Sequence, residues 1–456
     1  MRMKSAVLWC TVGLVAAACG SSSSSSSGTP GSSATTAGGG ATTAPATSTS
    51  GGSTPTSTPS SVDTSKNTAS DTGVTNDTVT IGLITSVTGA ASSTFKDTAD
   101  GARARIEAEN AKGGVYGRKI VLKIADDASE VPQDLVSAKS LVQNDKVFAV
   151  IGYSPKLFAS YRYLHDQGIP VTGSGFDGPE WRQLPYTNMF SWSSYDPTGL
   201  ANETDGLFWK KVGATKLAGL AYVDSKSSQK SIQQMQTSVE KAGLQMVVNN
   251  PSIPFGSVDL TAAVLDMKDK GANGATCSCV DSSNLAMMGA IKNANLPGFK
   301  GAMAFSGPTD NVFANSTATA AAEGNYFRSA QTPIIDADNP AVQEWKANLT
   351  KYIPSYKGSF PSYGVTGGYI SADLMIQMLK LAGQNPTRKG MMDATRQQLT
   401  SYDADGILAG RVSFALDKFE SGPDQVCFYY PSVENGKWVD TVGKICGAKI
   451  PGSTPK

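Results

Sequence analysis

Apolar runs alternate with amphipathic stretches along the first part of the chain that has the composition of a folded domain. Runs rich in Val, Ile and Leu occupy residues 79–84, 119–124 and 147–152, and each has the length of one buried strand. Residues 97–112 and 131–144 instead repeat their apolar side chains every three or four positions, which is typical of helices that cover a sheet. The pattern predicts a β-α-β-α-β unit with parallel strands.

The predicted helix at 97–112 has one apolar stripe and a charged remainder. Small and branched apolar side chains form the stripe, namely Ala99, Ala102, Ile106 and Ala108. We expect the charged side chains of the other faces to point into solvent, namely Arg103, Arg105, Glu107 and Glu109.

The same alternation begins again near residue 198 and continues in a third block after about residue 325. The expected helices are 198–212, 227–242, 259–270, 285–294, 339–352, 363–382 and 388–399. The expected strands are 216–223, 244–248, 275–280, 301–305, 412–414 and 426–430. Two α/β units of similar size predict an α/β fold with two lobes. Ligands bind beyond the carboxyl ends of the strands in such sheets, so we expect a cleft there.

The N-terminus has the features of an export signal. Arg2 and Lys4 give a positive start, and residues 6–18 are apolar but too few to remain as a membrane-spanning helix. Cys19 directly follows three alanines, an arrangement that resembles a bacterial lipoprotein box. The resemblance implies that the chain is cleaved before Cys19 and carries a lipid there. The alternative is ordinary signal-peptidase cleavage at the same point without a lipid.

The segment that follows Cys19 has no side chains that could build a core. Residues 20–70 are almost only Ser, Thr, Gly, Ala and Pro, a composition that predicts disorder. A coil of about 50 such residues spans roughly 40 Å. We therefore expect a signal peptide at 1–18, a lipidated cysteine with its linker at 19–75, and a protein tethered to the extracytoplasmic face of the cell membrane.

The charge balance argues against one class of partner, and the length of the chain bears on the number of lobes. The chain has 39 Lys and Arg against 38 Asp and Glu, with no basic stripe, which argues against nucleic acid as a partner. Roughly 380 residues follow the linker, enough for two lobes. No later run approaches the length of a membrane span.

Four cysteines follow the linker, an even number that suits an oxidising compartment. Three pairings are possible, and we favour a disulfide between Cys427 and Cys446, which would join a late strand to the C-terminal tail. Cys277 and Cys279 lie in a predicted strand, where a bridge would be strained; this favours free thiols, but the sequence leaves the state of the pair open. His165 is the only histidine and no Cys-x-x-Cys occurs, so we expect no metal and no cofactor.

Short motifs in a fixed order give the chain a resemblance to a known family. The motifs are Ile81-Gly82-Leu83, Thr88-Gly89-Ala90, Asp100-Gly101-Ala102, Gly113-Gly114-Val115, Val150-Ile151-Gly152, Gly168-Ile169-Pro170-Val171 and Gly368-Tyr369-Ile370-Ser371-Ala372. Over about residues 76–445 they resemble the type I periplasmic solute-binding proteins of the branched-chain amino acid (Leu/Ile/Val) class, which serve ABC importers.

The resemblance implies two Rossmann-like lobes joined by three hinge crossings, near residues 192–197, 326–332 and 400–405. The first lobe would then contain 76–193 with 330–401. The second would contain 194–329 with 402–446, followed by a tail at 447–456. Closure of the lobes on a small molecule would report occupancy to the permease of an ABC importer. We expect the protein to act as a monomer.

The resemblance also implies a set of ligand-binding residues. In the first lobe these are Thr94, Phe95, Ser154, Ser174, Gly175 and Phe176. In the second lobe they are Asp224, Ser282, Ser283, Ser306, Thr309 and Asp310. For each hydroxyl the competing interpretation is a helix cap or a turn residue.

The ligand itself stays open at this point. The loop at 305–310 lacks the glutamate that pairs with the ammonium of an amino acid in the type members, although Asp310 could replace it. A less polar or aromatic ligand, stacked on Phe176 or Trp181, is the alternative to an amino acid. No Gly-x-Ser-x-Gly elbow accompanies the single histidine, so we expect no enzyme. The competing function is a ligand sensor that signals through a membrane receptor.

Overall fold

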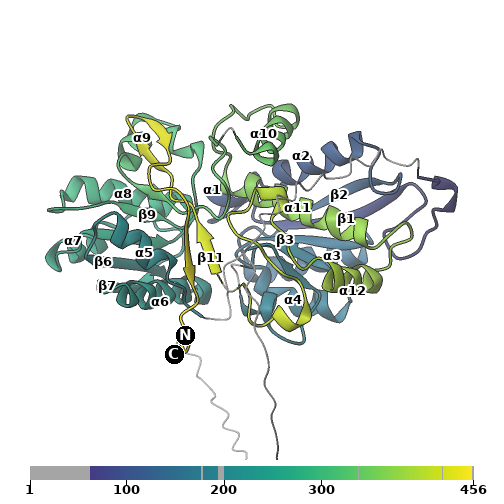
Figure 1. The fold of residues 1–456 in the computed structure, drawn as a ribbon, viewed down its shortest axis with the longest axis horizontal. Coiled ribbons are helices and arrows are strands. Elements are labelled where there is room, and N and C mark those ends of the chain that lie inside the picture. The colour runs from purple at the N-terminus through teal and green to yellow at the C-terminus, as the bar shows by residue number, and fades with distance from the viewer. Residues whose placement is uncertain (1–61, 176–177, 194–199, 337, 424, 454–456) are drawn as a thin grey trace, which may run out of the picture. The chain divides into compact units, whose positions relative to one another are not determined.

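The computed structural model describes the chain from the end of the linker almost to the C-terminus (Figure 1). The described residues are 62–175, 178–193, 200–336, 338–423 and 425–453. The predicted signal peptide, Cys19 and most of the linker lie outside these ranges. No helix among the described residues combines the length and apolar character needed to cross a membrane.

The first sheet has five strands in the order β2-β1-β3-β4-β5, and all neighbours run parallel. The strands are β1 (Thr78–Thr85), β2 (Lys119–Asp126), β3 (Ala149–Tyr153), β4 (Val171–Gly173) and β5 (Met189–Ser191). The helices of this lobe are α1 (Ser92–Phe95), α2 (Thr98–Ala111), α3 (Val131–Gln143), α4 (Tyr161–Asp166), α10 (Pro340–Tyr352), α11 (Tyr363–Leu381) and α12 (Arg388–Gln398). The strand and helix alternation predicted for residues 79–152 is confirmed.

Strand β1 shows why this sheet is covered on both faces. Val79, Ile81 and Leu83 belong to the same apolar cluster as residues of α2 and α11. Ile84 packs instead with Leu141 of α3. Because successive side chains of a strand point to opposite faces, an uninterrupted apolar run needs a helix layer on each side.

The second sheet has seven strands in the order β13-β12-β10-β9-β8-β6-β7, and it is mixed. Five strands run parallel: β6 (Lys216–Tyr222), β7 (Gln245–Ile253), β8 (Gly274–Ser278), β9 (Ala302–Ala304) and β10 (Tyr326–Phe327). Two late strands pair antiparallel at its edge: β12 (Ser432–Glu434) and β13 (Lys437–Val439). The helices of this lobe are α5 (Thr204–Lys211), α6 (Lys226–Lys241), α7 (Thr261–Asp269), α8 (Asp281–Ala294) and α9 (Ser316–Ala322). The predicted α/β class, with parallel-rich sheets in two lobes, is confirmed (Figure 1).

Both pairs of late cysteines form disulfides. Cys427 and Cys446 are direct neighbours on the antiparallel strands β11 (Gln425–Phe428) and β14 (Ile445–Ala448), which confirms the favoured pairing. Cys277 and Cys279, whose state the sequence left open, are also joined, against the free thiols that strain favoured. Their Cα atoms lie 5.1 Å apart where β8 ends, within the usual range for a disulfide.

Two expectations are wrong. Arg105 and Glu109 are buried, because α10 and α11 cover the face of α2 that we expected to be open. Residues 412–414 form no regular strand, and only an isolated bridge joins Val412 to Tyr402.

Helices α2 and α11 cross closely at glycines. A side chain at Gly101 would collide with the carbonyl oxygen of Val365, and one at Gly368 would collide with that of Thr98. This contact anchors the late helix α11 on the first lobe, where its first residue, Tyr363, lies against Phe95 and against Tyr153 at the end of β3.

Candidate ligand-binding site

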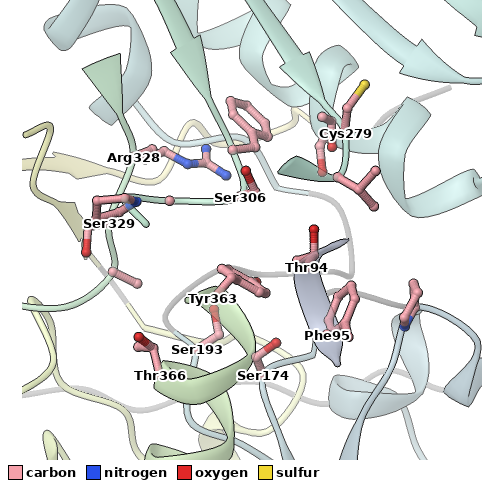
Figure 2. Close-up of a pocket in the computed structure, with 18 of the residues that line it drawn as sticks. Thr94, Phe95, Ser174, Ser193, Cys279, Ser306, Arg328, Ser329, Tyr363 and Thr366 are labelled. Atoms are coloured by element: carbon pink, nitrogen blue, oxygen red, sulfur yellow. The ribbon is translucent and has the colours of Figure 1, made fainter. Parts of the chain in front are cut away.

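A cavity of about 180 Å³ is lined by residues of both lobes. From the first lobe it receives Thr94, Phe95 and Ser174, which follow strands of the five-stranded sheet. From the second lobe it receives residues 278–280 after β8 and 305–308 after β9. Figure 2 shows Thr94, Phe95 and Ser174 on one side of the open space and Ser306 and Cys279 on the other. The cavity therefore lies beyond the carboxyl ends of the strands, where open α/β sheets bind ligands.

Aromatic rings form the first-lobe side of the cavity. Phe95 of α1 and Tyr363 of α11 line it, with ring centroids 5.8 Å apart and an edge-to-face orientation. Tyr153 packs against both rings, with its ring centroid 5.7 Å from that of Phe95 and 5.6 Å from that of Tyr363. Trp192 stacks on Tyr153 and is fixed by a 2.8 Å hydrogen bond from its Nε1 to Ser371 Oγ. The cluster offers an apolar platform with tightly defined geometry.

The hydroxyls near this platform stay in their neutral form. Burial raises the pKa of both the Tyr363 and the Tyr153 hydroxyl above the ordinary value of a tyrosine. Ser174 Oγ is buried and has no hydrogen-bond partner among the described residues. A ligand group at that point would satisfy it.

Arg328 lies on the opposite side, directly after β10. Its Nη1 donates to Asp205 Oδ2 at 2.8 Å, and Asp205 Oδ1 accepts from the Tyr430 hydroxyl at 3.0 Å. The guanidinium carbon lies 3.6 Å from the ring centroid of Phe305 and 4.5 Å from that of Phe428. The cation is thus held by one carboxylate and two rings.

Contacts between described residues join the two lobes beside the cavity. The backbone N–H of Asp281 donates to Thr94 Oγ1 at 3.0 Å, and Ser93 Oγ donates to Ser282 Oγ at 3.4 Å. Lys156 Nζ lies 4.3 Å from the ring centroid of Phe255. The structure therefore shows the lobes in contact across the site.

Asp281 itself is buried at the first turn of α8. Neither of its carboxylate oxygens has a hydrogen-bond partner among the described residues. Burial raises the pKa of Asp281 to about 7, and the side chains of Ser306 and Asn311 lower it by less. The carboxyl group stays largely protonated below neutral pH.

Four of the predicted ligand residues line the cavity: Thr94, Phe95, Ser174 and Ser306. Phe176 lies outside the described residues. Gly175 is buried beside the site, where its φ of +73° suits glycine and a side chain would meet Ser191 Oγ.

Ser154 has a different environment from the one the resemblance implies. Its hydroxyl donates to Asp127 Oδ2 and accepts the Lys156 N–H at 3.0 Å. Ser86 Oγ donates to Asp127 Oδ1 at 2.6 Å, so the aspartate joins the ends of β1, β2 and β3. Ser154 is not among the residues that line the cavity, and its contacts fit the turn interpretation.

The remaining second-lobe residues also bond within the protein. Ser283 accepts from the Tyr222 hydroxyl at 2.8 Å, and Thr309 caps the short helix at 310–313. Asp310 accepts from Trp438 Nε1 at 3.1 Å. Asp224 is exposed and lies outside the cavity lining, and Ser282 faces Ser93.

Sequence reasoning missed several lining side chains. Arg328 falls in the segment 326–332, which was expected to cross between the lobes, but no motif marked it. Tyr363 begins a late helix, and Phe360 and Phe428 also come from late segments. No local pattern indicates that these distant segments meet.

Two α/β lobes with a polar and aromatic cavity at their facing strand ends define a ligand-binding protein of the two-lobe class. The chain belongs to the periplasmic binding protein family, because the model of that family matches residues 78–425. This confirms the resemblance found in the sequence.

Three known proteins illustrate the similarity. A Leu/Ile/Val-binding protein homolog 7 from Brucella abortus (strain 2308) is 25% identical over 341 residues, covering 71% of this chain and 81% of the relative. A fatty acid ABC transporter substrate-binding protein from Thermomonospora curvata has a TM-score of 0.66 at 20% identity, covering 84% of this chain and 97% of the other. A solute-binding protein from R. palustris in complex with benzoate has a TM-score of 0.66 at 18% identity, covering 82% and 97%.

Proposed function

We propose that this chain is a lipid-anchored, extracytoplasmic solute-binding protein that captures a small organic molecule and delivers it to the permease of an ABC importer. The observation that carries the proposal is the cavity itself, lined by both lobes with rings, hydroxyls and one arginine. A ligand in that position contacts both lobes at once and favours their closed arrangement. An amino acid or a related aromatic compound fits this lining.

The compared proteins support a small organic ligand. Their descriptions name Leu/Ile/Val, fatty acid and benzoate. Relatives that bind or transport solutes also support a binding role without catalysis.

A thermal-shift screen tests ligand capture. The mature chain, residues 19–456 with Cys19→Ser, is heated with amino acids, their amides, aromatic acids and sugars. A ligand at one hundred times its dissociation constant adds about 2.7 kcal/mol to the free energy of unfolding. If no compound of a broad screen raises the melting temperature, the binding role is wrong.

Fractionation of cells tests the lipid anchor at Cys19. We expect the natural chain in the membrane fraction and the Cys19→Ser chain in the soluble extracytoplasmic fraction, because loss of the thiol removes the lipid attachment. Equal distribution of both chains would contradict the anchor while leaving ligand capture untouched.

A further inference from the structure

Arg328 lines the cavity, and one edge of its guanidinium group has no acceptor among the residues that the structure describes. Nη1 is occupied by Asp205 at 2.8 Å, whereas neither Nε nor Nη2 has a hydrogen-bond acceptor among the described residues. The side chain is only 11% exposed, and it lines the cavity. Figure 2 shows it extending toward the cavity beside Ser306. Both donors are therefore available to an acceptor on a ligand that enters the cavity.

The orientation of this edge is fixed before any ligand arrives. The rings of Phe305 and Phe428 contact the guanidinium group, and Asp205 is itself held by the Tyr430 hydroxyl. A ligand therefore meets an ordered cation and need not immobilise a flexible side chain.

Two neighbouring N–H groups on one guanidinium edge match the two oxygens of a carboxylate. Such a bidentate pair is among the strongest charge-assisted hydrogen bonds in proteins. Of the described residues that line the cavity, Arg328 is the only one with a charged side chain. The described lining thus offers a fixed positive charge and no carboxylate of its own, since the buried carboxyl of Asp281 follows the lining residue Val280 but is not part of the lining. An ammonium group left unpaired in such a cavity is costly.

The other residues of the lining determine the size and polarity of the ligand that fits the cavity. Phe95, Phe360 and Tyr363 give the site broad apolar faces. At roughly 10–15 Å³ for each water-sized group, the volume of about 180 Å³ has room for on the order of a dozen non-hydrogen atoms. A compact acid with a ring or a branched chain fits this space.

We propose that the ligand is a compact organic carboxylate without an ammonium group, held through Nε and Nη2 of Arg328, with its apolar body against the rings. This inference rests on the proposed solute-binding function and names the chemical class of its solute.

Matched compounds test the inference in the mature Cys19→Ser chain. One series is 3-phenylpropionate, phenylalanine and 3-phenylpropionamide, and the other is 4-methylpentanoate, leucine and 4-methylpentanamide. In at least one series we expect the carboxylate to bind roughly tenfold or more tightly than its amide and its amino acid, measured by calorimetry. An amino acid or an amide that binds as tightly as the carboxylate would overturn the inference and leave the proposed function standing.

Two variants separate ligand binding from a purely structural role of the ion pair. Arg328→Gln removes the anchor, so affinity for the carboxylate falls roughly tenfold to a hundredfold. Asp205→Asn leaves the cation without its internal partner, so carboxylate affinity rises. The melting temperature of each ligand-free variant shows whether it folds. If both variants lose affinity in parallel, Arg328 acts only by holding Asp205 and the inference is wrong.

A screen that finds no ligand at all bears on both proposals. If neither series nor the broad screen of the preceding section yields a ligand, both the inference and the proposed function fail together.

Discussion

Buried ionisable side chains of the first lobe are of two kinds, paired and unpaired. Arg105 Nη1 lies 3.0 Å from Glu109 Oε2, and Arg105 Nε lies 2.8 Å from Asp373 Oδ1, so two carboxylates pair with its charge. Asp134 is also fully buried, yet neither carboxylate oxygen has a hydrogen-bond partner among the described residues. Pairing keeps the first group charged, whereas lack of a partner favours the neutral form of the second.

Asp134 makes stability depend on pH in a direction that can be tested. The pKa of Asp134 is raised from 3.8 to about 8, mainly by burial, with a smaller lowering by Ser160 and smaller increases from the nearby carboxylates of Asp127 and Glu180. Between about pH 4 and 8 the folded state therefore holds a proton that the unfolded chain has released. The free energy of unfolding therefore falls as pH rises through this window. Above the folded-state pKa the loss of stability is complete, because the carboxyl group is then ionised in the folded chain as well.

We expect Asp134→Asn to exceed the natural chain in stability by about 1–3 kcal/mol at pH 8 and by little at pH 5. Urea denaturation across that range measures the difference. The exposed Asp224→Asn is the matched control and should show no pH-dependent gain. A gain of equal size at both pH values would refute the explanation.

The residues that sequence could identify were those within motifs. Thr94 and Ser174 follow strands of the first unit, where a ligand was expected. The family resemblance then identified these two residues among the others at the strand ends. Arg105 was misjudged because its partner Asp373 lies far along the chain, and Arg328 was missed because its role depends on Asp205 and two rings. Charge pairs between distant segments leave no local pattern.

At the level of elements, the crossing of α2 and α11 should tolerate no added methyl group. Gly101→Ala and Gly368→Ala each force a Cβ against a backbone carbonyl, which cannot turn away as a side chain can. We expect each to lower the free energy of unfolding by about 2–4 kcal/mol, measured by urea denaturation.

Gly289→Ala supplies the control within a helix. A Cβ there would meet only the Ala321 side chain, at an ordinary 3.8 Å. Alanine also favours helices, so this change should leave stability unchanged or raise it by up to about 1 kcal/mol. A similar loss at all three glycines would contradict the close-crossing explanation.

The two disulfides should differ greatly in their effect on stability. Cys427 and Cys446 close a loop of 19 residues, whereas Cys277 and Cys279 are separated by two. Loop-closure entropy predicts that replacing the first pair by serines costs about 3 kcal/mol. Replacing the second pair removes almost no loop and should cost much less. Thermal unfolding of both double variants measures the contrast, and the reverse order would refute it.

The long elements were predictable and the short ones were not. Helices such as α3 and α11 follow from apolar periodicity over many residues, and their observed bounds lie close to those expected. The short strands have only two or three residues, and each forms through its pairing with a neighbouring strand; they are β5, β10, β12 and β13. Residues 412–414 alternate as a strand would, but they find only the bridge to Tyr402.

At the level of the whole molecule, helix α8 is capped from the other lobe. Its own N-cap residue, Val280, has no side-chain acceptor, and the N–H of Asp281 is satisfied by Thr94 Oγ1. Separation of the lobes would break this bond. Part of the energy of capping, on the order of 1 kcal/mol, is therefore available only when the lobes are together.

Thr94→Val keeps the shape of the side chain and removes the acceptor. We expect ligand affinity to fall about fivefold, mainly through faster dissociation, with little change in the stability of the ligand-free chain. Stopped-flow dissociation and calorimetry measure this. Ser93→Ala removes only a 3.4 Å contact and should have a smaller effect. An equal loss in both variants would argue against the cap.

The order of elements along the chain also constrains how it becomes folded. Strands β1 to β5 are complete by residue 191, but α11, which covers β3 and β4, begins at Tyr363. The edge strands β12 and β13 of the second sheet come later still, after residue 431. While a chain emerges from its N-terminus, neither lobe can bury its core until most of the polypeptide has appeared. Folding is then a late event for both lobes, and the unfinished chain exposes apolar strand faces that need protection from aggregation.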